Sequence, residues 1–152
     1  MNLDYQLVQV ETTEEWKALH SLRSSELFEQ KEGVVYNTNH PHDHTANHFP
    51  LVLKLQGKCI GTARLDLFGN DAGAIRLVAV DPTMQRQGHG RVLEEKFEGF
   101  ARSKGISKLF VNANPAAAGF YEKLGFIYED WEDPAGPRSG LTKGSAQMKK
   151  IL

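Results

Sequence analysis

The feature that most constrains the fold is a strand that runs through a glycine-rich turn directly into a helix. The apolar segment AIRLVAVDP (74–82) is followed by QRQGHG (85–90), which has no side chain able to build a core, and then by the amphipathic RVLEEKFEGFARSKG (91–105). A further strand-like run, KLFVNAN, covers 108–114. A strand–helix–strand unit within one sheet implies a right-handed parallel crossover. The pattern therefore predicts an α/β fold in which a mixed sheet carries helices on its faces.

Hydrophobic periodicity and turn residues predict the remaining elements. Strands are expected over 3–10, 51–56, 59–68, 126–131 and 146–152. The strands between 51 and 82 should form an antiparallel meander, whose third and most apolar strand should be central and buried on both faces. A helix is expected over 13–30, after the capping-box pair Thr12 and Glu15, and a short helix should begin at Pro115 and close at Gly125. The segments 33–50 and 133–145 should be irregular.

Length, charge and cysteine content limit the class of protein. The 152 residues fit a single domain over 1–152, and the formal net charge of -1 argues against a nucleic-acid partner. No apolar run approaches the ~20 residues of a membrane span, and the N-terminus lacks the pattern of a signal peptide. The lone Cys59 fits a reducing compartment. We expect a cytoplasmic protein with no membrane partner.

The turn QRQGHG has the features of an anion site. The first N–H groups of a helix lack internal partners, and the helix dipole places partial positive charge there. Gly88 and Gly90 would let a ligand approach the backbone, and Arg86 could add a charge-assisted contact. A plain helix-start turn is the alternative. The turn lacks the G-x-x-x-x-G-K-[ST] pattern of a P-loop, and Leu93 stands where a dinucleotide fingerprint needs its third glycine.

Together with its neighbours, this turn resembles the pyrophosphate loop of the GNAT (Gcn5-related) N-acetyltransferases. QRQGHG fits their pattern Gln/Arg-x-x-Gly-x-Gly/Ala, between a strand and a helix. The preceding VAVDP (78–82), Asn114 after the next strand, and AAAGFYEKLGF (116–126) are the expected companions. The resemblance covers nearly the whole chain and is most specific over 74–126. It implies the GNAT acyl-CoA N-acyltransferase fold, with a mostly antiparallel sheet that contains one parallel crossover.

The resemblance also implies a cofactor site and a reaction. Acetyl-CoA would lie along the strand at 76–80 and pair with backbone groups of Val78, Ala79 and Val80, and Asn114 would contact its pantetheine arm. Tyr121 would protonate the leaving thiolate, although a packing role beside Phe120 is the alternative. An amine would attack the thioester directly in a ternary complex. Backbone N–H groups would hold the pyrophosphate at Gln85, Arg86, Gln87, Gly88, His89, Gly90 and Arg91.

The residue that takes the proton from the amine is not evident. Many GNAT proteins carry a glutamate on the central strand, where this sequence has Arg76. Asp66 on the neighbouring strand, a histidine from the segment 33–50, or a chain of waters could serve instead. This departure supports an alternative function, a non-catalytic acyl-CoA-binding regulatory domain.

The run HPHDHTANH (40–48) concentrates four histidines and Asp43. These are metal-ligand types, but the H-x-H-x-H spacing is not the helical pairing of zincins and no cysteine accompanies it. The run therefore favours a solvated loop, or a substrate-facing loop with His44 and His48 toward the acceptor, and no metal is expected. A metal-binding module remains a third hypothesis, with ligands His40, His42, His44 and His48.

Other charged and aromatic residues have plainer interpretations. Arg138 and Lys143 could pair with an acceptor carboxylate, although solvated loop charges are the favoured reading. Lys149 and Lys150 should keep a strand end soluble, and Trp16 and Trp131 should be packing residues. The expected partner is a small-molecule or peptide primary amine, and a homodimer is possible because dimers are common among the proteins that the chain resembles. Acceptor identity and acyl chain length cannot be read from loop composition.

Overall fold

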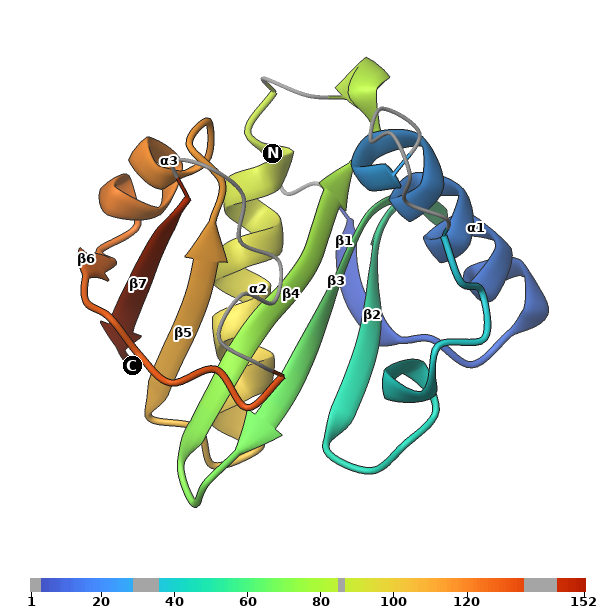
Figure 1. Cartoon of the computed structure of the whole chain (residues 1–152). Coiled ribbons are helices and arrows are strands. Elements are labelled where there is room, and N and C mark those ends of the chain that lie inside the picture. Colours follow the sequence, from blue (N-terminus) through green and yellow to red (C-terminus); the bar gives the residue numbers. More distant parts are fainter. Residues whose placement is uncertain (1–3, 29–35, 85–86, 136–144) are drawn as a thin grey trace.

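The computed structural model describes residues 4–28, 36–84, 87–135 and 145–152. It contains one seven-stranded sheet in the order β1-β2-β3-β4-β5-β7-β6 (Figure 1). The strands are β1 (Tyr5–Gln9), β2 (His48–Leu55), β3 (Lys58–Phe68), β4 (Ala72–Val80), β5 (Lys108–Ala113), β6 (Ile127–Tyr128) and β7 (Ala146–Ile151).

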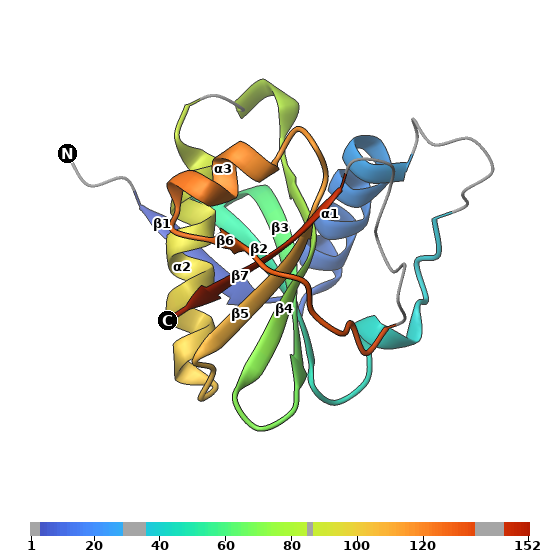
Figure 2. The same cartoon turned by 60° about the vertical axis from the view of Figure 1, so that its left-hand side comes forward.

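Helices cover both faces of this sheet (Figure 2). One face carries α1 (Thr13–Arg23), which continues as the π-helical turn η1 (Ser24–Phe28). The other carries α2 (His89–Ser103) and α3 (Ala118–Lys123). Two 3-10 turns, η2 (Pro41–Asp43) and η3 (Pro82–Met84), complete the described helical segments. The predicted α/β architecture is confirmed.

The pairing of the strands is also as predicted. β4 and β5 are parallel, joined by the crossover through α2, and the other described pairs are antiparallel. β4 is the fourth of seven strands and therefore central. Its residues 72–75 are buried, whereas 76–78 and 80 are partly exposed. The prediction that it is buried on both faces therefore holds only for its first half.

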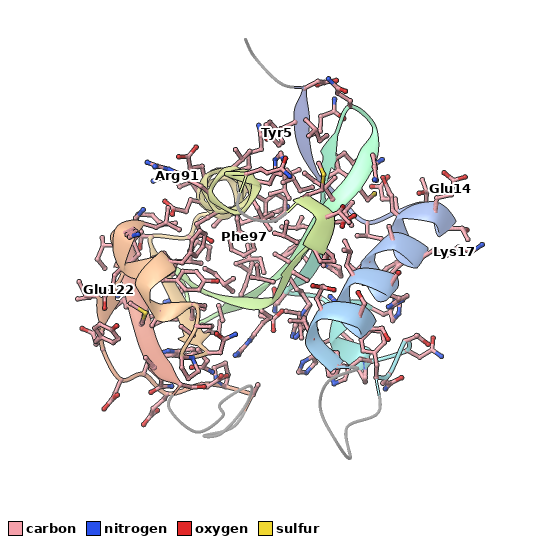
Figure 3. The ribbon with its side chains drawn as sticks, turned by 90° about the horizontal axis from the view of Figure 1, so that it is seen from above. Tyr5, Glu14, Lys17, Arg91, Phe97 and Glu122 are labelled. Carbon is pink, nitrogen blue, oxygen red and sulfur yellow. The ribbon has the colours of Figure 1, made fainter. Side chains whose placement is uncertain are left out.

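The main core lies between α2 and the sheet. Leu93, Phe97 and Ala101 share one side of α2 and are buried at 2%, 1% and 0% exposure. Viewed along α2, Phe97 points toward the strands (Figure 3). Burial of each large apolar side chain contributes about 1.5–3 kcal/mol. This packing fixes the position of the N-terminus of α2 relative to the end of β4.

The capping box that predicts the start of α1 is present. The backbone N–H of Glu15 donates to Thr12 Oγ1 at 3.1 Å, and the N–H of Thr12 donates to Glu15 Oε1 at 3.0 Å. The helix expected over 13–30 is confirmed as far as Phe28: it is regular α-helix to Arg23 and a π-helical turn over Ser24–Phe28, and residues 29 and 30 lie outside the described residues.

Two predicted bounds are wrong for local reasons. Pro115 lies in a turn in which the N–H groups of Ala117 and Ala118 donate to the carbonyl of Asn114, and α3 begins at Ala118. The strand expected over 126–131 is only Ile127–Tyr128. Beyond it, the N–H of Trp131 donates to Gln147 Oε1 at 3.1 Å, so a side chain replaces the backbone partner that would continue the strand.

Lys150 also differs from its expected role as a solubilising charge. Its ammonium donates to both carboxylate oxygens of Glu98 on α2, at 2.9 and 3.0 Å. Glu98 is buried at 6% exposure. The pair therefore ties β7 to α2 inside the structure, where burial of one partner without the other would be costly.

Candidate active site

The candidate site begins where β4 leaves β5. The parallel ladder between them runs from Ala72–Lys108 to Ile75–Val111, whereas β4 continues to Val80. Leu77 has a left-handed φ of 51°, and the register of β3 with β4 shifts between Thr62 and Arg64. A non-glycine residue in this conformation marks local strain, and a bulge bends the strand that contains it. The bulge thus accompanies the divergence of the two strands seen in Figure 1.

Beyond this divergence, β4 leads to the N-terminus of α2. Gly88 is the N-cap in a left-handed conformation with φ 85°, and no side chain caps the helix there. A Cβ built on Gly88 would have nothing within 4 Å, so the space above it is open. Gln87 donates to the carbonyl of Thr83 at 3.2 Å, which holds the turn closed. Backbone N–H groups beside open space form a place for an anion.

We call the backbone from Gln85 to Arg91, which is predicted to hold the pyrophosphate, the cradle. Two of its side chains point away from such an anion. His89 is buried at 5% exposure, and its Nδ1 lies 2.6 Å from the hydroxyl of Tyr5 on β1. Arg91 is exposed, pairs with Glu95 and points outward (Figure 3). Their backbone N–H groups remain the part available to a ligand. Gln85 and Arg86, which belong to the same predicted cradle, lie outside the described residues.

Tyr121 lies on α3 and is buried at 4% exposure between the rings of Phe120 and Phe126. Burial raises the pKa of its phenol, and the nearby Glu94 carboxylate raises it further. The phenol therefore keeps its proton at neutral pH. Glu94 is itself buried, and burial together with Glu98 raises its pKa to about 8. Tyr121 thus packs between two rings and carries its proton, and its raised pKa makes it a weaker acid than a free phenol.

Asn114 stands at the end of β5, on the strand next to β4. It is exposed, and its Oδ1 accepts a hydrogen bond from the N–H of Ala117 at 2.9 Å. This bond orients the amide and leaves its NH₂ group directed elsewhere. Asn114 follows β5 and Tyr121 lies on α3, and both α3 and the N-terminus of α2 lie at the end of the sheet where β4 ends (Figure 1).

The opposite face of the sheet carries a row of ion pairs. Arg76 donates to both oxygens of Asp133 at 2.5 and 2.6 Å and to Asp66 at 3.4 Å. Arg64 donates to both oxygens of Asp66 at 2.7 and 3.0 Å and to Asp43 at 3.5 Å. Arg23 also donates to Asp43. We call this row the ion chain; it consists of Arg23, Asp43, Arg64, Asp66, Arg76 and Asp133.

The ion chain contains both Arg76, which stands at the position expected for a glutamate, and Asp66, which is one candidate base. Arg76, which stands on the strand expected to carry a glutamate, is paired with two carboxylates. Both oxygens of Asp66 already accept hydrogen bonds from Arg64, and Oδ2 also accepts one from Arg76. Asp43, read in the sequence as a metal-ligand type, instead pairs with Arg23 and Arg64 and is 5% exposed.

The histidines of 40–48 divide into two groups. His44 is exposed and its ring lies against Trp16, with centroids 5.0 Å apart. His42 and His48 are stacked, with centroids 4.4 Å apart, and both lie beside Asp66. Burial is the main cause that lowers the pKa of His42, and the neighbouring His48 and Arg64 lower it further. His40 packs edge-on against His42 and accepts a hydrogen bond from the N–H of His42.

The segment after β6 also reaches the ion chain. Asp133 accepts hydrogen bonds from Asn112 at 2.8 Å and from the N–H of Ala135 at 2.8 Å, in addition to Arg76. Burial alone would raise the pKa of Asp133, but the hydrogen bonds from Arg76, Ala135 and Asn112 and the charge of Arg76 together outweigh it, and the pKa is lowered. Trp131 packs on Phe68 and Phe110, as expected for a packing residue. Arg138 and Lys143 lie outside the described residues.

Sequence reasoning missed three participants. Arg23 lies in a predicted helix and Asp133 at the start of a predicted loop, and neither position shows a pattern. Glu94 interrupts the apolar side of α2, which was the one available signal: a carboxylate at a core position must be paired or protonated.

Comparisons with known proteins identify the family to which the chain belongs. The sequence model of the Acetyltransferase (GNAT) family matches residues 13–126. A Bacillus subtilis (strain 168) protein described as an acetyltransferase is 33% identical over 67 residues, which are 44% of this chain and 45% of that protein. The chloroplastic serotonin N-acetyltransferase 2 of rice is 41% identical over 52 residues, which are 34% of this chain and 26% of that protein.

A solved structure extends the likeness to the whole fold. N-acetylglutamate synthase from Neisseria gonorrhoeae, in complex with coenzyme A and L-arginine, superposes with a TM-score of 0.75 at 20% identity. The superposition covers 97% of this chain and 33% of that one. At this identity the likeness concerns the fold alone. The family match over 13–126 is the decisive finding, and the chain belongs to the GNAT family of acetyltransferases.

Proposed function

We propose that the protein is an N-acetyltransferase that moves the acetyl group of acetyl-CoA to a primary amine of a small molecule or peptide. The observation that carries this proposal is the path of β4. It parts from β5 at Ile75, passes the Leu77 bulge and leads to the open Gly88 cap of α2. A diphosphate at the helix N-terminus and an extended arm beside β4 would fit this path.

In this proposal the cradle binds through its backbone. N–H groups between Gln85 and Arg91 hold the pyrophosphate, and Val78, Ala79 and Val80 offer backbone groups to the pantetheine arm. Asn114 approaches the arm from β5. Because His89 turns inward to Tyr5 and Arg91 turns outward to Glu95, these two residues would contact the diphosphate through their main-chain N–H groups.

The reaction then proceeds by direct attack in a ternary complex. The amine nitrogen forms a bond to the thioester carbonyl carbon, and a strand N–H group stabilises the developing oxyanion. The carbon–sulfur bond breaks as the carbonyl re-forms. Tyr121 protonates the departing thiolate to give free CoA. The attacking nitrogen gives up its extra proton to a chain of waters, and a proton from solvent restores the phenol of Tyr121. The raised pKa of Tyr121 keeps the phenol protonated before the thiolate departs, but it also makes the phenol a weaker acid. The proposed role therefore rests on the resemblance of AAAGFYEKLGF (116–126) to the family pattern.

The acceptor class rests on a fragmentary comparison. The rice relative is named for serotonin, a small primary amine, and the match covers 26% of its length. We propose an acceptor of similar chemistry, a primary amine on a small molecule or at a peptide position. The test is to incubate the protein with acetyl-CoA and a panel of primary amines while measuring release of free CoA thiol. Turnover with an amine, dependent on Tyr121, supports the proposal.

A second candidate function is an acyl-CoA-binding domain without transferase activity. The observation that favours it is Arg76, which occupies the central strand and is engaged by Asp66 and Asp133. This candidate predicts that acetyl-CoA binds but that no amine in the panel releases CoA. Robust transfer to any amine contradicts it.

Location and assembly complete the proposal. No helix among the described residues is long and apolar enough to cross a membrane. We propose a cytoplasmic protein that acts on an amine rather than on nucleic acid, in keeping with its formal net charge of -1. A homodimer is proposed as its assembly, and sedimentation velocity would measure it.

A further inference from the structure

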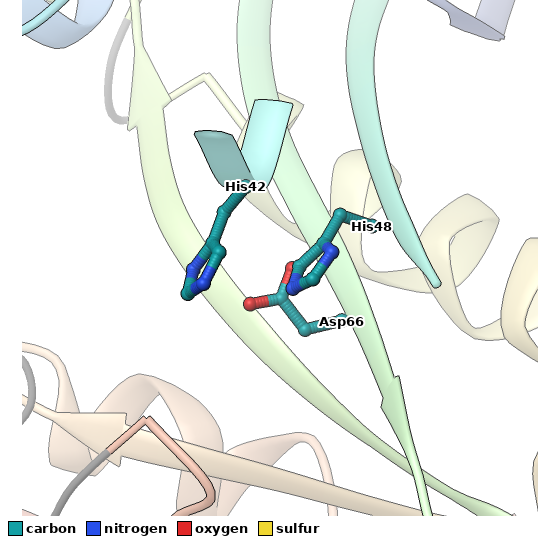
Figure 4. A group of neighbouring side chains, drawn as sticks. All are labelled: His42, His48 and Asp66. Atoms are coloured by element: carbon teal, nitrogen blue, oxygen red, sulfur yellow. The ribbon is translucent and has the colours of Figure 1, made fainter. Parts of the chain in front are cut away.

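Two imidazoles and a carboxylate meet on the face of the sheet that carries the ion chain (Figure 4). They belong to His42, His48 and Asp66, and one potential ligand atom of each lies within 4.8 Å of the others. His48 and Asp66 are direct cross-strand partners of β2 and β3. His42 is brought to them by the turn η2, whose Asp43 is anchored by Arg23 and Arg64. Strand pairing and the turn η2 thus bring the three residues together.

The hydrogen bonds of His48 prepare it to bind a metal. Its Nδ1 lies 2.9 Å from the carbonyl of Ala46 and 3.0 Å from the hydroxyl of Thr45. Because a carbonyl can only accept, the bond to Ala46 places the ring proton on Nδ1 and leaves the lone pair on Nε2. Such a second contact, which fixes the tautomer and the ring direction, accompanies most metal-ligating histidines.

The geometry points to a binding site for a divalent metal ion of the zinc type, with His42, His48 and Asp66 as its protein ligands. Imidazole nitrogen favours Zn²⁺, Co²⁺, Ni²⁺ and Cu²⁺ over Mg²⁺ or Ca²⁺, which prefer oxygen. Three protein ligands would leave one or more positions to water or to a substrate group. The sequence-based expectation of no metal considered only the run 40–48. The β2–β3 register adds the carboxylate of Asp66, which lies outside this run.

Closing the site on an ion requires a limited movement. Two ligands about 2.1 Å from one ion lie at most about 4.2 Å apart, and the two rings are nearly parallel at 11°. Parallel rings cannot direct both lone pairs at one ion, so one ring must turn. His42 is the ring that turns, because its side chain forms no hydrogen bond within the described part of the chain. The His48 ring is held by its hydrogen bond to the carbonyl of Ala46. Asp66 would bind the ion through a remaining lone pair, because its two oxygens already accept hydrogen bonds from Arg64 and Arg76.

The test measures metal binding to the whole protein, without a histidine tag and after removal of metal by a chelator. Co²⁺ is the probe, because its visible absorption reports the number and type of its ligands. We expect one equivalent to bind with a spectrum of nitrogen–oxygen coordination. His42→Gln and His48→Gln should each weaken binding by about tenfold or more. The matched control is His44→Gln, which removes an exposed histidine of the same segment that packs on Trp16, and it should leave affinity within about twofold.

A second measurement guards against misfolding of the variants. Zn²⁺ should raise the unfolding temperature of the wild type and of His44→Gln, because a ligand that binds only the folded state stabilises it. It should not raise that of the double variant His42→Gln/His48→Gln. The proposal is overturned if the wild type shows no saturable Co²⁺ binding. It is also overturned if the double variant binds Co²⁺ as tightly as the wild type. Neither readout involves acetyl-CoA, so this site can fail while the proposed transferase function stands, and the reverse.

Discussion

The guanidinium of Arg76 and the carboxylate of Asp133 form a two-point ion pair, with nitrogen–oxygen distances of 2.5 and 2.6 Å. Arg76 lies on the central strand next to the Leu77 bulge, and Asp133 lies in the segment that follows β6. Their side chains are 10% and 1% exposed. The pair therefore joins β4, where the thioester is proposed to lie, to the segment that follows the edge strand β6.

Breaking this pair should destabilise the fold. Asp133→Asn leaves a buried guanidinium that has only Asp66 as an ionic partner among the described residues, and loss of one member of a buried pair costs about 3–5 kcal/mol. Urea unfolding should show this loss of free energy. The matched control is Asp130→Asn, at an exposed position of the same segment, which should change stability by less than about 0.5 kcal/mol.

The double variant Arg76→Met/Asp133→Leu separates pairing from packing. Replacing both charges by apolar groups removes the unpaired charge, so it should recover most of the stability that Asp133→Asn loses. A double variant as unstable as Asp133→Asn would show that the ion pair is not the cause.

Glu94 should make stability depend on pH. Its pKa is raised from 4.5 to about 8 by burial and by Glu98. Between these values the unfolded chain has released the proton and the folded chain retains it, so the free energy of unfolding falls as pH rises. We expect a loss on the order of 3 kcal/mol between pH about 5 and 8, and little further change from this group above that range.

Glu94→Gln tests this expectation, because the amide is neutral at every pH. Urea unfolding at both ends of the range should show a flatter pH dependence for the variant and higher stability than the wild type at the alkaline end. The exposed neighbour Glu95 provides the control: Glu95→Gln should keep the wild-type pH dependence. Equal slopes for the wild type and Glu94→Gln would remove Glu94 as the source.

Tyr121→Phe should lower the turnover rate with the best amine of the panel by about 10²–10⁴-fold, as expected for loss of a general acid. The ring still fills its place between Phe120 and Phe126, so circular dichroism and acetyl-CoA affinity should change little. Tyr128→Phe, at a 57% exposed tyrosine, is the control and should keep full activity. Unchanged turnover in Tyr121→Phe would assign the tyrosine to packing alone.

The sequence predicted those parts of the fold that local patterns encode. The strand–turn–helix–strand unit of 74–114 implied the parallel crossover, and the alternating strands implied the antiparallel pairs around it. The pair Thr12 and Glu15 marked the start of α1, because a capping box is complete within four residues. The same local character allowed the family resemblance to be recognised over 74–126.

The parts that could not be predicted depend on contacts between distant segments. Nothing near Arg76 indicates that its partner is Asp133, 57 positions later. The inward turn of His89 depends on Tyr5, which lies 84 positions away. The end of β6 was missed because the side chain of Gln147 replaces a backbone partner. In each case tertiary packing decides what local propensity leaves open.

The most direct test of the central claim is calorimetric titration with acetyl-CoA and free CoA. Wild type should bind both, and Gly88→Trp should abolish binding because its indole fills the open space above the cap of α2. Gly69→Trp provides the matched control: it has a similar left-handed φ of 62°, open space and a position at the opposite end of β4, and it should bind like wild type. Failure of the wild type to bind either ligand, or equal binding by Gly88→Trp, would contradict the account.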